Sequence, residues 1–200
     1  MKSNRWLFII GIGIGLALVL WWGIPMLTPH SFHGTLLQSP STAQDFTLLS
    51  HTGQEVSLSD FRGKLVLLYF GYTFCPDVCP ATLSEVAGAL DILGKEADNI
   101  QFIMISIDPE RDSPQKLAEY VSHFDPSFLG VTGDPERIAE IATLYGIFFE
   151  KNKGSVATGY LIDHTATITV IDQEGHVKLI IPFGTQAKDI ADDLDYLLKH

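Results

Sequence analysis

The feature that most constrains this fold is a pair of apolar runs, each long enough to form one strand. Leu65–Phe70 has the sequence LVLLYF, and Phe102–Ile107 has the sequence FIMISI. Neither run alternates regularly with polar residues, so both faces of each strand need to be covered by other elements. Strands buried on both faces are typical of α/β domains, in which helices pack on each side of a sheet.

Helix and hairpin signals around these runs favour the same class. A proline in the first turn and a glycine at the end predict a helix from Pro80 to about Gly94. Ser113 and Asp134, each followed by proline, begin two further helices, and Thr185 begins the last. Shorter strands are expected at 45–49, 55–58, 160–162, 167–172 and 177–182. The sequence therefore predicts an α/β fold, with a mixed sheet and helices on both faces.

The N-terminal segment is apolar throughout. From Trp6 to Leu27 every residue is apolar or glycine, apart from a proline at position 25. As a helix this run would span about 33 Å, which is enough to cross the hydrocarbon core of a bilayer. Lys2 and Arg5 precede it, and the first acidic residue is Asp45. The positive-inside rule then keeps the N-terminus in the cytoplasm and exports the rest.

A cleaved signal peptide is the alternative for this segment. Such peptides have a shorter apolar stretch and end in a small-residue site, whereas this run ends in PMLTP. The absence of an Arg- and Ser-rich transit sequence favours a bacterial source. We expect an uncleaved, single-pass transmembrane helix at 1–27 in the bacterial cytoplasmic membrane, followed by a flexible tether at 28–43. The domain at 44–200 is then expected on the outer, periplasmic or extracytoplasmic, face.

The charge of the expected exported part excludes one class of partner. Without Lys2 and Arg5, 11 basic residues remain beside 24 acidic ones, a net charge of −13. So acidic a surface repels phosphate groups, and we expect no nucleic-acid partner. Acidic side chains also keep ordinary proteins soluble, so the charge alone identifies no positive partner.

The only two cysteines lie where the first central strand is followed by a helix. Cys75 and Cys79 occur in the segment GYTFCPDVCP. Unpaired backbone N–H groups and the helix dipole stabilise thiolates at such a position. A thiolate is both the nucleophile of disulfide exchange and a soft metal ligand. A structural disulfide that closes so short a loop stabilises a fold very little, so we expect redox or metal chemistry.

The spacing of the cysteines leaves both chemistries open. Disulfide oxidoreductases typically place two residues between their cysteines, and this chain places three. A metal needs further ligands, and His164, in a predicted loop between two strands, is the candidate. Its neighbours Asp163 and Thr165 can orient the ring. Two thiolates and one imidazole suit copper, but from spacing alone His164 is equally an ordinary loop histidine.

Other residues have weaker claims. Three charged residues of one loop are expected to form a structural network, with a partner contact as the alternative: Asp108, Arg111 and Asp112. Asp77 is either a solvated turn carboxylate or a group that attracts cations. His30 and His33 form a His-x-x-His pair in the tether, which we expect to be solvated. Three aromatic residues are expected to pack around the site: Tyr72, Phe74 and Tyr160.

Three segments resemble the Sco/SenC family of cytochrome oxidase assembly proteins. The segment GYTFCPDVCP at 71–80 is similar to the copper-site loop of that family. SIDPERDSP at 106–114 and DHT at 163–165 are similar to its second and third signatures, and all three occur in the family's order. The resemblance covers about 45–198, and an N-terminal membrane anchor is also typical of the family. It implies a thioredoxin-like fold and copper, as Cu(I) or Cu(II).

The ligands that the resemblance implies are Cys75, Cys79 and His164. The implied function is that of a membrane-anchored copper chaperone for the dinuclear copper site of cytochrome c oxidase subunit II. Another periplasmic copper chaperone or a thiol reductant would be a further partner. The alternative is a thiol–disulfide oxidoreductase that keeps the cysteines of the acceptor reduced, with the two cysteines of this chain as its redox pair. A peroxidase fits poorly, because YTFC does not match a Thr-x-x-Cys loop. The resemblance thus favours a metallochaperone over an enzyme.

Overall fold

The computed structural model describes residues 6, 9–15, 30–153 and 159–200. The chain divides into two compact units, Met1–Ser31 and Phe32–His200. In the first unit the described residues 6 and 9–15 are helical, and most of the predicted transmembrane segment lies outside the described residues. Within the described part of the chain, no helix combines the length and the apolar character needed to span a bilayer.

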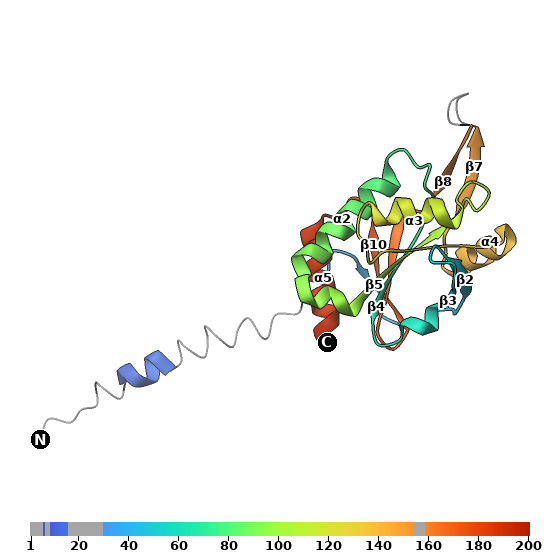
Figure 1. The fold of residues 1–200 in the computed structure, drawn as a ribbon. Coiled ribbons are helices and arrows are strands. Elements are labelled where there is room, and N and C mark those ends of the chain that lie inside the picture. The colour runs from blue at the N-terminus through green and yellow to red at the C-terminus, as the bar shows by residue number, and fades with distance from the viewer. Residues whose placement is uncertain (1–5, 7–8, 16–29, 154–158) are drawn as a thin grey trace, which may run out of the picture. The chain divides into compact units, whose positions relative to one another are not determined.

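A mixed sheet of eight strands forms the centre of the larger unit (Figure 1). The strand order is β1-β10-β9-β4-β5-β6-β2-β3. The bounds are Thr35–Leu36 for β1, Thr47–Ser50 for β2, Glu55–Ser57 for β3, Leu65–Gly71 for β4, Ile100–Ser106 for β5, Leu129–Thr132 for β6, Thr167–Ile171 for β9 and Val177–Pro182 for β10. β4, β5 and β6 run parallel to one another, and the other pairs are antiparallel.

A separate antiparallel hairpin and four long helices complete this unit. The hairpin consists of β7 (Phe149–Lys153) and β8 (Tyr160–His164). The helices are α2 (Val78–Leu93), α3 (Pro114–Ser122), α4 (Pro135–Leu144) and α5 (Ala187–Lys199), with short 3-10 helices at Leu58–Phe61 and Gly94–Asn99. These elements confirm the prediction of a mixed sheet with flanking helices. β1, β6 and β7 were not predicted, because a strand of two residues and short strands that contain glycine or charged residues show no clear period.

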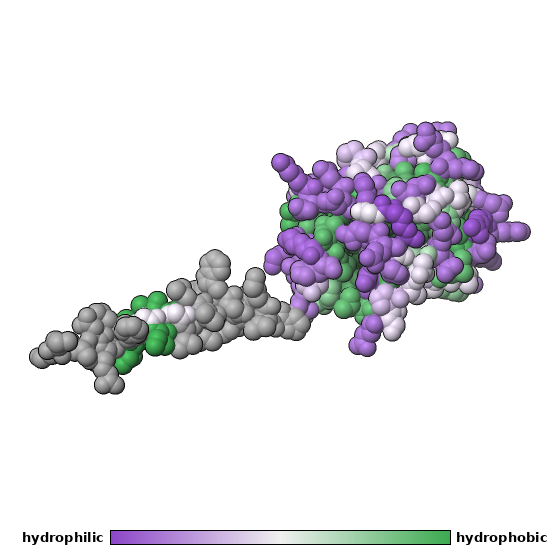
Figure 2. All heavy atoms as spheres, turned by 90° about the horizontal axis from the view of Figure 1, so that it is seen from below, coloured by the Kyte–Doolittle hydropathy of each residue, from purple (hydrophilic) through white to green (hydrophobic). Residues whose placement is uncertain are grey.

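The central strands are buried as their apolar sequences predict. All seven residues of β4 are buried, and in β5 only Gln101 is partly exposed. Side chains of β4 alternate between the two faces of the sheet. A Cβ atom on Gly71 would point at the Cys79 sulfur of α2, whereas the ring of Phe70 lies 6.0 Å from that of Tyr145, just after α4. Helices thus cover both faces of the main sheet. On the larger unit in Figure 2, most of the side chains that face the viewer are hydrophilic.

Part of the predicted tether lies on the domain. β1 pairs with β10 at the edge of the sheet. Asp193, which is buried in α5, accepts hydrogen bonds from the backbone N–H groups of His33 and Gly34. The predicted domain start at residue 44 is therefore later than the start of the larger unit at Phe32.

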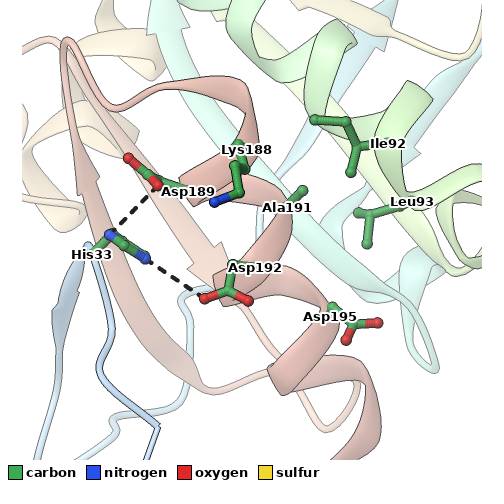
Figure 3. A pocket seen from close by; sticks show the side chains of 8 residues that line it. All are labelled: His33, Ile92, Leu93, Lys188, Asp189, Ala191, Asp192 and Asp195. Carbon is green, nitrogen blue, oxygen red and sulfur yellow. Dashed lines mark ion pairs between the residues drawn. The ribbon is translucent and has the colours of Figure 1, made fainter.

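The same contact changes the interpretation of one tether histidine. The imidazole of His33 lies between the carboxylates of Asp189 and Asp192, 3.7 and 3.6 Å away (Figure 3). It borders a groove of about 400 Å³ beside α5. His33 thus lies against the domain, with an exposed ring between two carboxylates, rather than in a free tether. A strand of two residues leaves no periodic pattern, so this docking could not be predicted.

Candidate metal centre

Cys75 and Cys79 lie in the loop after β4 and in the first turn of α2. The helix begins at Val78, two residues before the predicted start. Because the first four N–H groups of a helix have no partner within it, Pro80 costs no hydrogen bond at the third helical position. Cys79 is consequently inside the helix rather than at its cap. It is completely buried, whereas Cys75 is half-buried.

Gly71 makes room for the buried sulfur. A Cβ atom on Gly71 would lie 3.1 Å from Sγ of Cys79 and 2.7 Å from Cε1 of Tyr69. Contacts this short would force the ring or the sulfur to shift, and both are packed in the core. A glycine at the end of β4 is therefore part of what places Cys79 against the strand.

His164 faces the cysteines from the end of β8. It is the last residue of that strand, which is two residues longer than predicted, rather than part of a loop. Its Nε2 atom lies 3.5 Å from Sγ of Cys79, and its Nδ1 atom lies 3.1 Å from the carbonyl oxygen of Thr165. A carbonyl only accepts, so Nδ1 carries a proton and donates to Thr165, which leaves Nε2 directed at the sulfurs.

The two predicted neighbours of the ring have different roles. Thr165 orients the imidazole, but through its backbone carbonyl rather than its hydroxyl. Asp163 does not contact the ring, and its carboxylate accepts from the amide of Asn152 on β7. The rings of Tyr69 and Tyr72 stand edge-on to the imidazole, with centroids 6.1 Å away in each case. These rings confine the imidazole on two sides.

The three predicted ligands meet at one point. One donor atom from each of Cys75, Cys79 and His164 lies within 4.8 Å of the other two. Donors this close can surround a single ion, and two sulfurs with one imidazole nitrogen suit a soft or borderline metal. A groove of about 320 Å³ between the cysteine loop and β8 opens onto Cys75 and His164. An ion or a partner side chain can therefore reach the site.

The two thiols differ in acidity. The hydrogen bond with the Cys79 thiol lowers the pKa of Cys75 to about 4, and interactions with His164 and with backbone N–H groups contribute. One of these groups, the N–H of Cys79, lies 3.4 Å from Sγ of Cys75. The pKa of Cys79 is raised, because its contact with the Cys75 thiolate and its burial disfavour a second charge. The reduced pair therefore holds one thiolate, on the more accessible sulfur.

The predicted network in the loop after β5 is present and buried. Asp112 accepts from the N–H and the hydroxyl of Thr73 and from a serine hydroxyl at the end of β5. Asp108 forms an ion pair with Arg111 and accepts from the hydroxyl of Tyr160. Both carboxylates are completely buried. The network fixes the cysteine loop on one side and reaches the hairpin on the other.

Two tyrosines have polar roles that were not predicted. Tyr72 and Tyr160 were expected only to pack, but each places its hydroxyl in a hydrogen bond, to the N–H of Ile162 and to Asp108 respectively. The sequence held only a general signal for these hydrogen bonds, namely that buried tyrosine hydroxyls usually have a partner. Asp77 precedes α2 without forming a side-chain cap and borders the groove.

The fold and the site together define a class, a thioredoxin-like α/β domain with two cysteines where a strand is followed by a helix and a histidine facing them from a hairpin. The SCO1/SenC family model matches residues 35–199, and the chain belongs to that family. Protein sco1 of Schizosaccharomyces pombe is 38% identical over 157 residues, which are 76% of this chain and 59% of that protein. A SCO2-like protein of Rickettsia felis is 36% identical over 151 residues, 75% of this chain and 74% of that protein.

Solved structures of related proteins have the same fold. Apo Sco1 from Thermus thermophilus is 41% identical, with a TM-score of 0.75 and coverage of 84% of this chain and 98% of that chain. ScoI of Bradyrhizobium japonicum with copper bound is 38% identical, with a TM-score of 0.70 and coverage of 78% and 99%. Yeast Sco1 with copper bound is 31% identical, with a TM-score of 0.71 and coverage of 80% and 90%. The match over most of each chain agrees with the predicted architecture.

Proposed function

We propose that this chain binds copper and serves in the assembly of cytochrome c oxidase. The observation that carries the proposal is the convergence of Cys75, Cys79 and His164, whose donor atoms lie within 4.8 Å of one another. Family members of similar fold are described with copper bound. Thiolate and imidazole ligands are those that copper accepts in both oxidation states.

The openness of the site supports transfer rather than permanent storage. Cys75 is half-buried and, with His164, borders the groove. A thiol of an acceptor can approach from this groove and replace one ligand at a time. Cys79 is completely buried and would be the last ligand to release the ion. The order of ligand exchange would then run from the surface inward.

The finer features of the function follow the family resemblance. The acceptor is the dinuclear copper site of subunit II of the oxidase, and another copper chaperone or a thiol reductant serves this chain. Residues 1–27 anchor it in the bacterial cytoplasmic membrane, with the domain on the outer face. The apolar sequence from Trp6 to Leu27 supports the anchor.

Thiol–disulfide exchange is the second candidate function. The pKa of Cys75 is lowered to about 4, which keeps its sulfur ionised at neutral pH. Ionised, accessible sulfur next to a second cysteine is the arrangement for attack on a disulfide and resolution of the mixed disulfide. In this function the chain would reduce the cysteines of the acceptor, and His164 would be dispensable.

An anaerobic copper titration of the reduced full chain in detergent separates the two functions. The His164→Ala variant is compared with His123→Ala, which removes an exposed histidine after α3. We expect one tight copper in the wild type and in His123→Ala, and weaker binding in His164→Ala. Equal affinity in all three would contradict the three-ligand site. Reduction of an oxidised subunit II fragment by His164→Ala at the wild-type rate would then favour the exchange function.

A further inference from the structure

His164 lies outside the main sheet. β7 and β8 pair with each other in a separate two-stranded sheet, and Figure 1 shows this hairpin projecting from the body of the domain. Four of the five residues of β7 are exposed. The cysteines, in contrast, follow a strand that is buried in the middle of the main sheet. Some other contact has to hold the imidazole beside the sulfurs.

Two side chains bind the edge of β8 that faces the cysteine loop. The N–H of Ile162 donates to the hydroxyl of Tyr72 at 3.1 Å, and the carbonyl of Tyr160 accepts from Nη1 of Arg111 at 3.0 Å. On the opposite edge, the N–H of Thr165, just after β8, donates to the carbonyl of Phe148, just before β7. Alternate residues of a strand direct their backbone N–H and C=O groups to opposite edges. The backbone groups of residues 160, 162 and 164 therefore point away from β7.

We propose that Tyr72 and Arg111 are positioning residues that hold His164 beside the two cysteines; this inference rests on the proposed copper site. Both contact the backbone of β8 two or four residues before His164. Neither belongs to the three-ligand set. Their effect on the metal passes through the placement of the imidazole.

Tyr72 links β8 directly to the cysteine loop. It is almost completely buried, and its carbonyl accepts from the N–H of Cys75 at 3.3 Å. One residue thus contacts the cysteine loop through its backbone and the histidine strand through its side chain. Loss of its hydroxyl would leave the buried N–H of Ile162 without this acceptor, which favours departure of the strand from the site.

Arg111 forms the second link and is itself held in place. It is ion-paired with the buried carboxylate of Asp108. Its guanidinium lies 3.7 Å from the centroid of the Tyr160 ring and 4.9 Å from that of Phe74. A planar guanidinium can bond a carboxylate and a carbonyl while it stacks on rings, and a lysine ammonium cannot reproduce this geometry. Arg111 therefore attaches the start of β8 to the loop after β5.

The test measures the copper affinity of the reduced full chain for Tyr72→Phe and Arg111→Lys, each with and without His164→Ala. These substitutions keep the ring and the charge and so preserve the fold. Groups that orient a metal ligand typically change affinity by 10–100-fold. We expect a loss of about tenfold for each variant when His164 is present, and no further loss in the His164→Ala background.

The matched controls change a tyrosine hydroxyl and an arginine ion pair that do not contact the three candidate ligands. Tyr145→Phe removes a hydroxyl that donates to the carbonyl of Gln44 at 2.6 Å, and Arg137→Lys alters an exposed ion pair with Glu140. We expect wild-type copper affinity in both. A second readout needs no metal: hydrogen–deuterium exchange at Ile162 should be faster in Tyr72→Phe than in Tyr145→Phe.

Three results would overturn the inference. One is wild-type copper affinity in Tyr72→Phe and Arg111→Lys, and another is unchanged exchange at Ile162 in Tyr72→Phe. The third is an equal loss of affinity with and without His164, which would show that the variants act through the sulfurs. Failure of the proposed function is a different result, namely equal copper affinity of the wild type and His164→Ala alone.

Discussion

The sulfur half and the imidazole half of the site are built in different ways. Cys79 is completely buried in a helix that packs on β4, a strand whose seven residues are all buried. His164 ends a two-stranded hairpin outside the main sheet. The sulfurs are therefore fixed by the core, whereas the imidazole is held by a few side-chain contacts. Perturbing the first half should cost stability, and perturbing the second should cost metal affinity at little cost in stability.

The largest loss of stability is expected for Asp112→Ala. This buried carboxylate accepts from three donors, two of them on Thr73 in the cysteine loop. Its removal leaves those donors without an acceptor and should reduce the free energy of unfolding by about 3 kcal/mol. Urea denaturation of the reduced chain measures the change. Asp98→Ala, at an exposed position, is the control and should change it by less than about 0.5 kcal/mol.

The outcome for Asp112→Ala bears directly on the contrast between the two halves. A loss as small as that of Asp98→Ala would mean that the cysteine loop is not fixed by the carboxylate. A large loss of stability that comes from opening of the β7–β8 hairpin alone would mean that the sulfur half and the imidazole half depend on the same network.

A smaller loss is expected for Gly71→Ala. The added methyl would lie 2.7 Å from the ring of Tyr69 and 3.1 Å from the sulfur of Cys79. Overpacking of this kind typically costs about 1–3 kcal/mol, and here it should also displace the buried sulfur and weaken copper binding. Denaturation and copper titration measure the two effects.

The control for this substitution is Gly88→Ala in α2. Its added methyl meets only Cβ of Ala187, at 3.0 Å, and replacing a helical glycine by alanine gains about 1 kcal/mol in helix propensity. We expect a smaller change in stability and unaltered copper affinity. Equal copper affinity in Gly71→Ala and Gly88→Ala would contradict the role given to Gly71.

The same contrast explains how much could be predicted from the sequence. β4 was predicted because an unbroken apolar run has one solution, a strand covered on both faces. Ser113 and Asp134 accept hydrogen bonds at their helix starts as their positions before proline indicate. Signals of this kind are local, and they placed the cysteines at the junction of strand and helix.

The contacts that locate His164 have no local signal. Tyr72 and Ile162 are 90 residues apart, and Arg111 and Tyr160 are 49 apart. The charged residues of β7 show no apolar alternation, so the hairpin partner of β8 was missed. Spacing alone left His164 undecided for this reason, and only the resemblance of the three segments to a family favoured it as a ligand.

The smallest structural perturbation is a change of pH. It should distinguish the reactivities of the two cysteine sulfurs without altering the fold. Cys75 has a pKa lowered to about 4, so its alkylation by iodoacetamide in the reduced, metal-free chain should vary little between about pH 5.5 and 8. An ordinary thiol, with a pKa of about 8.5, would react about tenfold faster per pH unit over this range. Cys79 is buried with a raised pKa and should remain unmodified. Mass spectrometry of the alkylated peptides measures both.

The sign and the source of this effect can be checked in two variants. The hydrogen bond from Cys79 is the largest contribution to the low pKa of Cys75. Cys79→Ala removes it, so the thiolate of Cys75 should require a higher pH and the alkylation profile should move upward. His164→Ala removes a smaller contribution and should move the profile less. If the wild-type rate instead rises about tenfold per pH unit up to pH 8, the thiolate is not preformed, and the exchange function loses its chemical basis.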